Sequence, residues 1–177
     1  MMFVELNTRR LLLRPLSVDD LHSVHQYACD PENTKFMLHL PNRTLEETER
    51  FLKNVQSEWQ KPRPSFYEFA VVLHGRQIGA VSLYLNEVET EGELGWILHR
   101  PFWANGYATE AASAVRDFAF TLPGLARLVA HCDVRNVASR RVMEKIGMTL
   151  ERADGQRQYP DTLETAAELM FLLNRNS

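Results

Sequence analysis

The chain is poor in the residues from which disulfide frameworks and metal sites are built. Its 177 residues include two cysteines, Cys29 and Cys132, about a hundred positions apart. The six histidines are scattered without the short spacing that metal ligands need. These scarcities exclude a disulfide-stapled module and a zinc-knuckle protein, and we expect a metal-free domain.

Long apolar runs and a strong excess of charge are absent as well. No stretch approaches the ~18 apolar residues of a membrane span. The start, MMFVELNTRR, lacks the order of basic, apolar and small residues of a signal peptide. The net charge of −3 leaves no broad basic footprint for nucleic acid. With 45% hydrophobic and 24% charged residues, the sequence predicts one soluble, cytoplasmic domain over 1–177, with no membrane or direct nucleic-acid partner.

The first half of the chain alternates strand-like and helix-like segments. Thr44 and Glu47 form a capping box that predicts a helix start, and we expect this helix to end before Pro62. The tripeptide HGR at 74–76 separates two segments rich in β-branched and aromatic residues, which predicts a hairpin. A further helix is expected from Ser17. The expected strands are residues 9–16, 66–73, 77–85 and 93–99.

The second half alternates strand and helix more regularly. Apolar residues at helical spacing predict a helix over 107–122. A second helix follows over 136–147, with Asn136 as N-cap and Gly147 as C-cap. Strands are expected at 127–134 and 165–173. Hairpins followed by strand–helix alternation are typical of the α+β class.

The segment PFWANGYATEA at 101–111 places small residues directly before a helix. A helix start carries about four unpaired N–H groups and about half a positive charge, so it attracts phosphate when no bulk covers it. Gly106 allows a ligand to approach closely. The segment is neither a P-loop nor a dinucleotide fingerprint, because the Gly-Lys-Ser/Thr ending and the three spaced glycines are missing. Alone, the loop is as compatible with water as with a ligand.

Three motifs in order place this loop in a known context. They are TRRLLLRPLSVDD near the start, ELGWILHRPFWANGYATEAA in the middle and NVASRRVMEKIGM near the end. Together they resemble the GNAT superfamily of acetyl-CoA-dependent N-acetyltransferases, and within it the RimJ/RimL-like branch. The resemblance covers most of the chain. It implies a central, mostly antiparallel twisted sheet of about seven strands flanked by about four helices.

The resemblance also implies where acetyl-CoA binds. In the family, a pattern of Gln or Arg, two residues, Gly, one residue, then Gly or Ala holds the pyrophosphate. Here the pattern falls on Trp103, Gly106 and Ala108. Ala104 stands where the branch often has glycine, so we expect its backbone to avoid angles that favour glycine. The pantetheine arm is implied to pair with the backbone of Ile97 and Leu98 and to contact Asn136 and Ser139. The implied main-chain donors of the loop are Ala104, Asn105, Gly106, Tyr107, Ala108 and Thr109.

The implied reaction is attack of a neutral amine on the thioester carbonyl, which needs a proton acceptor. Glu93 is the first candidate base, because it begins the strand beside the thioester. His131, on the neighbouring strand, is the second, because it titrates near neutrality. Ser139 is implied to protonate the leaving thiolate. Each has an ordinary alternative: Glu93 in a solvated acidic turn, His131 as a structural histidine and Ser139 as part of a helix cap.

The amine acceptor stays open at this stage. The resemblance favours a protein N-terminus of the ribosomal-protein type, and a small amine such as a polyamine, amino acid or antibiotic is the alternative. A non-catalytic acyl-CoA-binding module is the third possibility. We expect residues 30–45 and the last hairpin to form the acceptor pocket. The acidic turn at 87–93 would suit a cationic acceptor of either kind, and the chain is expected to be a monomer or a homodimer.

Overall fold

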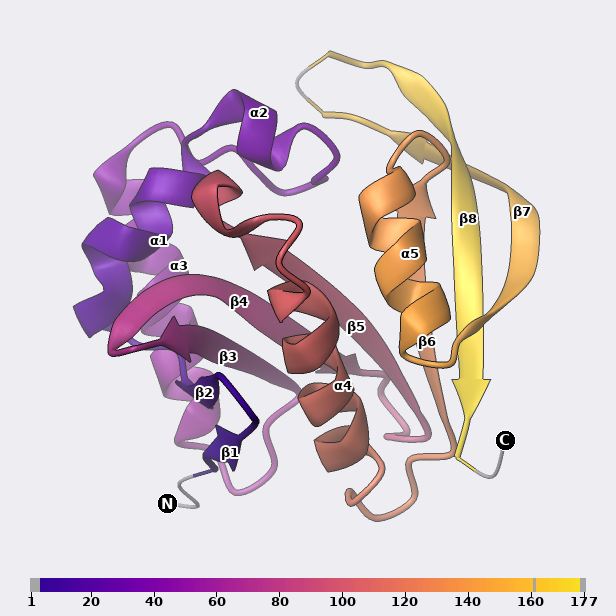
Figure 1. Ribbon diagram of the computed structural model, residues 1–177, viewed down its shortest axis with the longest axis horizontal. Helices are drawn as coiled ribbons and strands as arrows, with labels where there is room; N and C mark the ends of the chain where they lie inside the picture. The colour runs from indigo at the N-terminus through magenta and orange to yellow at the C-terminus, as the bar shows by residue number, and fades with distance from the viewer. Residues whose placement is uncertain (1–3, 161, 176–177) are drawn as a thin grey trace.

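A computed structural model describes residues 4–160 and 162–175 and arranges them around one twisted sheet (Figure 1). Within the described residues the sheet has eight strands in the order β1-β2-β3-β4-β5-β6-β8-β7. Neighbouring strands run antiparallel except β5 and β6, which are parallel. The strands are β1 (Leu6–Asn7), β2 (Leu12–Pro15), β3 (Phe66–Leu73), β4 (Arg76–Leu85), β5 (Glu91–Leu98), β6 (Arg127–Asp133), β7 (Thr149–Gln158) and β8 (Thr165–Asn174).

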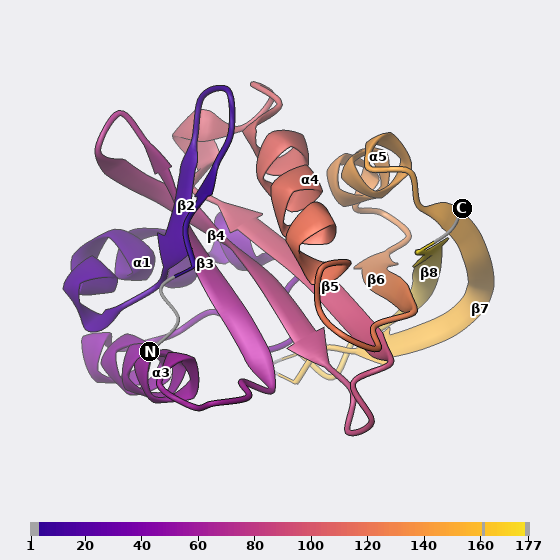
Figure 2. The same cartoon turned by 90° about the horizontal axis from the view of Figure 1, so that it is seen from below.

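The helices cover the sheet on two sides. Figures 1 and 2 show α4 and α5 side by side on one face, and α1 and α3 packed together at the half of the sheet that holds β3 and β4. Among the described residues, no helix combines the length and apolar character that crossing a membrane requires. The helices are α1 (Leu21–Ala28), α2 (Pro31–Thr34), α3 (Leu45–Trp59), α4 (Tyr107–Ala119) and α5 (Val137–Lys145), with short 3-10 turns at Val18–Asp20 and Arg100–Phe102.

Local sequence signals explain the best predicted elements. The capping box at the start of α3 is formed: the Thr44 hydroxyl accepts from the Glu47 N–H at 3.2 Å, and the Glu47 carboxylate accepts from the Thr44 N–H at 3.3 Å. The β3–β4 hairpin turns at His74 and Gly75, whose φ angles of 49° and 79° match a two-residue turn with left-handed geometry. Both predictions are confirmed.

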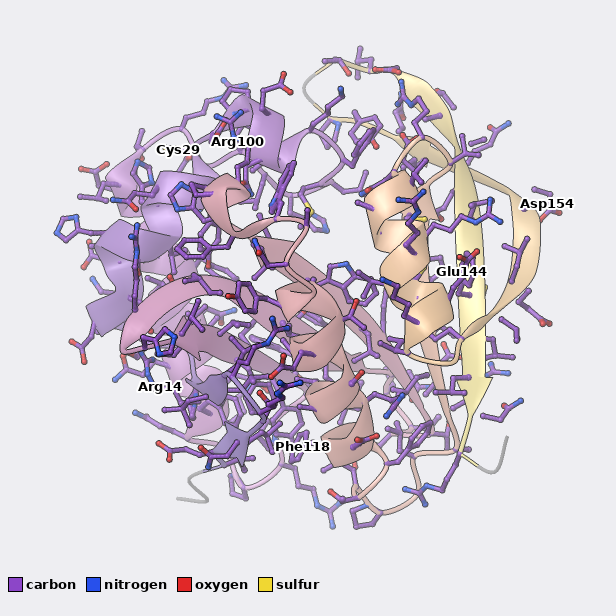
Figure 3. The ribbon with its side chains drawn as sticks, viewed as in Figure 1. Arg14, Cys29, Arg100, Phe118, Glu144 and Asp154 are labelled. Carbon is purple, nitrogen blue, oxygen red and sulfur yellow. The ribbon has the colours of Figure 1, made fainter. Side chains whose placement is uncertain are left out.

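Helix α4 lies close against the sheet because its buried face consists of small side chains. Phe118, at the far end of this helix, adds edge-to-face contacts with Tyr67 and Phe69, with ring centres 5.2 and 5.4 Å apart (Figure 3). Small residues and interlocking rings pack densely and fix the position of the helix. The start of α4 is thereby held at a defined distance from β5. The fully buried residues of the helix are Ala111, Ala112, Val115 and Ala119.

The α+β class and the mostly antiparallel sheet are confirmed, but both element counts were low. Eight strands and five α-helices are present within the described part of the chain, rather than about seven and about four. Strand β7 was missed because it is an edge strand with almost every residue exposed, so it lacks alternating hydrophobicity. Strand β1 and helix α2 are too short, at two and four residues, to carry a periodic signal.

Candidate active site

Strands β5 and β6 separate halfway along their length. Their parallel pairing covers only Glu91–Glu93 with Arg127–Val129, while β5 continues to Leu98 and β6 to Asp133. Parallel neighbours require a crossover connection, which here contains α4. Beyond the three paired residues of each strand, β5 and β6 diverge. Among the described residues, no strand pairs with the β6-facing edge of β5 from Leu94 onward. A strand edge of this kind accepts an extended ligand as an added strand would be accepted.

Alternate peptide groups of β5 face opposite neighbours, and this decides which of them lie on the open edge. The His99 N–H donates to the Ile78 carbonyl on β4 at 2.9 Å, so odd-numbered residues of β5 point toward β4. Ile97 is paired with Ala80 in that ladder, and its peptide groups are directed away from the open edge. Of the two residues expected to meet the pantetheine arm, Leu98 has its peptide groups on the open edge and Ile97 has its peptide groups toward β4. The peptide groups on the open edge are those of Leu94, Trp96 and Leu98.

The loop between β5 and α4 offers a row of donors. In the described part of the chain, none of the amide N–H groups of residues 104–109 donates to a protein acceptor. Gly106 is the N-cap of α4 and has φ +78°, so it adopts the left-handed conformation that glycine favours. Amides without a protein acceptor at the positive end of a helix form the kind of site that binds phosphate groups.

Ala104 departs from the expectation made for it. Its φ is +60°, within the left-handed region that L side chains rarely adopt. The backbone therefore does not avoid angles that favour glycine; it takes one, at a cost of about 1–2 kcal/mol. Strain of this kind persists where the surrounding structure imposes it. The loop therefore has a left-handed backbone at position 104 although the residue there is not glycine.

Trp103 and Asn105 fix the loop from within. The Trp103 indole N–H donates to the Leu98 carbonyl at 2.7 Å, and the Asn105 amide donates to the Trp103 carbonyl at 2.8 Å. Trp103 nevertheless keeps 47% of its surface exposed. One acceptor position of the Leu98 carbonyl is occupied by this bond, while a carbonyl oxygen can accept two. The end of β5 and the loop are therefore one connected unit.

Helix α5 follows β6, so it begins across the separated strands from the start of α4, which follows β5. The Asn136 side-chain oxygen accepts from the Ser139 N–H at 3.1 Å, which confirms Asn136 as the N-cap. The cap uses the amide of Ser139, not its hydroxyl. That hydroxyl makes no hydrogen bond within the described residues, and the side chain is half-buried. The helix ends at Lys145 with Ile146 as C-cap, one residue before the expected Gly147, which has φ +89°.

Glu93 and His131 are brought into direct contact. Glu93 Oε1 lies 2.9 Å from His131 Nδ1, at the point where β5 and β6 part. The hydrogen bond from Glu93 raises the pKa of His131 above its ordinary value, and partial burial opposes this shift. The side chains keep 52% and 27% of their surfaces exposed. The pair is thus accessible and able to exchange a proton with a neighbour.

A buried carboxyl group near this pair was not foreseen. Glu68 on β3 is 7% exposed, and its Oε1 accepts from the Tyr84 hydroxyl at 2.9 Å. Burial raises the pKa of Glu68 to about 7, although the hydrogen bond from Tyr84 opposes the shift. Tyr84 pairs directly with Glu93 across the β4–β5 ladder, so the two side chains share one face. Only the strand register reveals this row, because its members are far apart in sequence.

The two segments expected to form the acceptor pocket contact each other, but no residue of 30–45 lines the pocket found beside His131. The Arg157 guanidinium on β7 donates to the Phe36 carbonyl at 3.0 Å and pairs with Glu168 at 2.8 Å. A pocket of about 250 Å³ opens beside His131 between β6, β7 and β8. The segment at 30–45 is also tied to the loop after β5, because Arg100, labelled in Figure 3, pairs with Asp30 at 2.8 Å. The pocket is lined by His131, Arg152, Gly155, Gln156, Glu168 and Met170.

Comparison with known proteins agrees with this geometry. The family model of the acetyltransferase (GNAT) domain matches residues 10–149. The uncharacterized N-acetyltransferase YnaD of Bacillus subtilis (strain 168) is 32% identical over 153 residues, which cover 84% of each chain. The spermidine N(1)-acetyltransferase of Escherichia coli (strain K12) is 26% identical over 141 residues, or 78% of this chain and 73% of that one.

A solved structure extends the likeness to nearly the whole fold. The RimL ribosomal L7/L12 alpha-N-protein acetyltransferase in complex with coenzyme A superposes with a TM-score of 0.86 at 19% identity, covering 97% of this chain and 98% of the other. At this identity the likeness concerns the fold. The matched domain spans the separated strands, the loop of free amides and α5, and the chain belongs to the GNAT acetyltransferase family as an N-acetyltransferase.

Proposed function

We propose that this N-acetyltransferase moves the acetyl group of acetyl-CoA to a primary amine, with a protein N-terminal α-amine as the first candidate acceptor. The observation that carries the proposal is the meeting of three features at one place. These are the six unpartnered amides of residues 104–109, the open edge of β5 and the Glu93–His131 contact of 2.9 Å. Together they provide an anion site, a docking edge and a proton acceptor.

The residues present suit the parts of acetyl-CoA. The amides of residues 104–109 would hold the pyrophosphate at the positive end of α4. The open peptide groups of Trp96 and Leu98 would pair with the amides of the pantetheine arm, as in strand addition. Asn136 and Ser139 would contact the arm from α5. Bound in this way, acetyl-CoA supplies the thioester from which the acetyl group is transferred.

The chain's own groups would manage charge and protons. An open N–H of β5, at Leu94 or Trp96, can stabilise the oxyanion that forms when the amine attacks. The amine must lose a proton to reach the neutral amide product. Glu93, in contact with His131, is the proposed acceptor, directly or through one water. The thiolate leaves and takes a proton, for which the unbonded hydroxyl of Ser139 is the proposed donor.

Carboxyl groups near the acceptor face would suit an amine that carries positive charge, although Arg152 also lines the pocket. Glu68, Glu93 and Glu168 lie on or beside this face, although Arg157 neutralises Glu168. The pocket of about 250 Å³ beside His131 falls just below the range of about 300–1,000 Å³ of typical ligand sites. A pocket of this size suits the end of a peptide. A small polyamine is the second candidate, supported by the acidic groups and by the spermidine-acetylating relative.

An acetyl-transfer screen tests the proposal. Purified protein is incubated with acetyl-CoA and either peptides with different N-terminal residues or small amines, and the free thiol released is recorded. Acetylation of at least one primary amine, confirmed by mass spectrometry, is the expected result. Binding of acetyl-CoA without transfer to any amine would contradict the proposal and favour an acyl-CoA-binding module.

A further inference from the structure

Glu110 places a carboxylate in the first turn of α4, directly behind the proposed phosphate site. The carboxylate accepts from the Thr8 hydroxyl at 2.7 Å and from the Arg10 backbone N–H at 2.8 Å. It also pairs with the Arg10 Nε at 2.7 Å. Partial burial opposes ionisation, but these hydrogen bonds lower the pKa of Glu110 below its ordinary value. The first turn therefore carries a full negative charge at neutral pH.

This charge conflicts with anion binding. A carboxylate in the first turn stabilises an empty helix, because it faces the positive end of the macrodipole. A pyrophosphate at the same helix end would be repelled, since one helical turn spans only about 5.4 Å. A phosphate-binding helix with a first-turn glutamate needs a compensating cation nearby.

Arg10 is that cation, and it contacts the loop on both sides of Gly106. Besides its bond to Glu110, its Nη1 donates to the Asn105 carbonyl at 3.0 Å. The guanidinium lies over the Tyr107 ring, with 4.5 Å between the central carbon and the ring centre. Its Nη2 is 3.5 Å from where a Cβ on Gly106 would stand. One side chain from the β1–β2 turn thus holds the residues on both sides of Gly106.

We propose that Arg10 is a positioning residue for coenzyme A: it cancels the charge of Glu110 and fixes the Asn105 carbonyl so that the amides of residues 104–109 stay directed at the pyrophosphate. The inference rests on the proposed binding of coenzyme A at this loop. It assigns a binding role to a residue of the N-terminal hairpin, far from the loop in sequence. The proposed charge compensation of Glu110 distinguishes this role of Arg10 from a purely structural one, in which Arg10 only attaches the β1–β2 hairpin to the loop.

The test uses three variants: Arg10→Met, Glu110→Gln and the double variant. Arg10→Met leaves Glu110 uncompensated, so we expect about a tenfold weaker affinity for coenzyme A by calorimetry and a matching rise in the KM for acetyl-CoA. The kcat at saturation should stay unchanged. The double variant removes the repelling charge and should recover most of the affinity. Arg9→Met, which removes an exposed cation from the same turn, is the control and should bind normally.

Pantetheine, which lacks the phosphates, is the second probe. Its binding should be unaffected by Arg10→Met, and the defect toward coenzyme A should shrink as salt is raised. Equal defects in Arg10→Met and the double variant, or a defect that extends to pantetheine, would overturn the inference and leave a structural attachment. Absence of coenzyme A binding by the wild-type protein would instead contradict the proposed function. If Arg10→Met does not fold, the double variant, which lacks the unpaired carboxylate, is compared directly with wild type. A tenfold loss of coenzyme A affinity in the double variant would then overturn the electrostatic role.

Discussion

Glu93 on β5 and His131 on β6 touch at the point where their strands part, with 2.9 Å between Oε1 and Nδ1. The last residue of β6 that pairs with β5 is Val129, two residues before His131. Both side chains therefore point to the same face, next to the opening that would admit the thioester. This placement puts the two candidate bases in contact, so variants of each are needed to distinguish them.

The first prediction concerns the base. Glu93→Gln keeps size and hydrogen bonding but cannot accept the proton, so we expect about a 100-fold lower kcat if Glu93 is the base. If His131 accepts the proton instead, it must be neutral, and activity rises with pH through its raised pKa. Glu93→Gln removes the main cause of the raised His131 pKa. In that case the acidic limb of the pH–rate profile should move to lower pH.

His131→Asn separates the two cases. With Glu93 as base, this variant should change the acidic limb of the pH–rate profile only slightly. With His131 as base, the limb should disappear and the rate should fall. Wild-type profiles in both variants would show that neither residue serves as the base, and that the amine binds already deprotonated.

The second prediction concerns Ser139. Because the helix cap uses its N–H and not its hydroxyl, Ser139→Ala should leave the free energy of unfolding unchanged. If the hydroxyl protonates the thiolate, kcat should fall while the KM for acetyl-CoA stays near the wild-type value. Asn136→Ala is the matched comparison and should destabilise the protein by about 1 kcal/mol through loss of the cap. Normal turnover in Ser139→Ala would refute the assigned role.

The third prediction concerns Gly106, one of the two left-handed positions of the loop. Gly106→Pro removes an amide and cannot adopt φ +78°, so the affinity for coenzyme A should fall sharply in calorimetry. Circular dichroism serves as the check that the variant is folded. Unchanged affinity in folded Gly106→Pro protein would argue against the phosphate site.

The fourth prediction is the converse change at the neighbouring position. Ala104→Gly relieves the strain at φ +60°, worth about 1–2 kcal/mol, against about 0.5–1 kcal/mol of added chain entropy. A net gain of roughly 0–1.5 kcal/mol in unfolding free energy follows from these two terms. Chemical denaturation measures it, and coenzyme A affinity should not decrease. A less stable Ala104→Gly variant would mean that the strain is smaller than the entropy term.

The fifth prediction is a pH dependence of stability. Burial raises the pKa of Glu68 to about 7, so between about pH 4.5 and 7 the folded protein holds this proton more tightly than the unfolded chain. Stability contributed by the neutral carboxyl is therefore lost as pH rises through that window. Glu68→Gln removes this loss. From pH 5 to pH 8, the unfolding free energy of the variant minus that of wild type should therefore increase by about 3 kcal/mol. A constant difference between variant and wild type across this range would show that Glu68 ionises normally.

Much of this protein follows from local sequence alone. The Thr44–Glu47 capping box, the His74–Gly75 turn and the Asn136 cap act within a few residues, so their chemistry is legible without the fold. The loop before α4 was identified for the same reason, since small residues before a helix start are a local pattern. Strand β7 gave no such signal, because an exposed edge strand buries too little to impose alternation.

Tertiary structure decided the relationships that depend on register and on contacts between distant segments. Which peptide groups of β5 face the open edge depends on its pairing with β4, and this pairing places those of Trp96, not those of Ile97, on that edge. The φ of Ala104 is imposed by the bonds that hold the loop, against the preference of the residue itself. The Glu68–Tyr84 and Arg10–Glu110 contacts join residues 16 and 100 positions apart. Their chemistry arises only when the sheet and α4 bring them within hydrogen-bonding distance, because no local pattern relates residues so far apart in the chain.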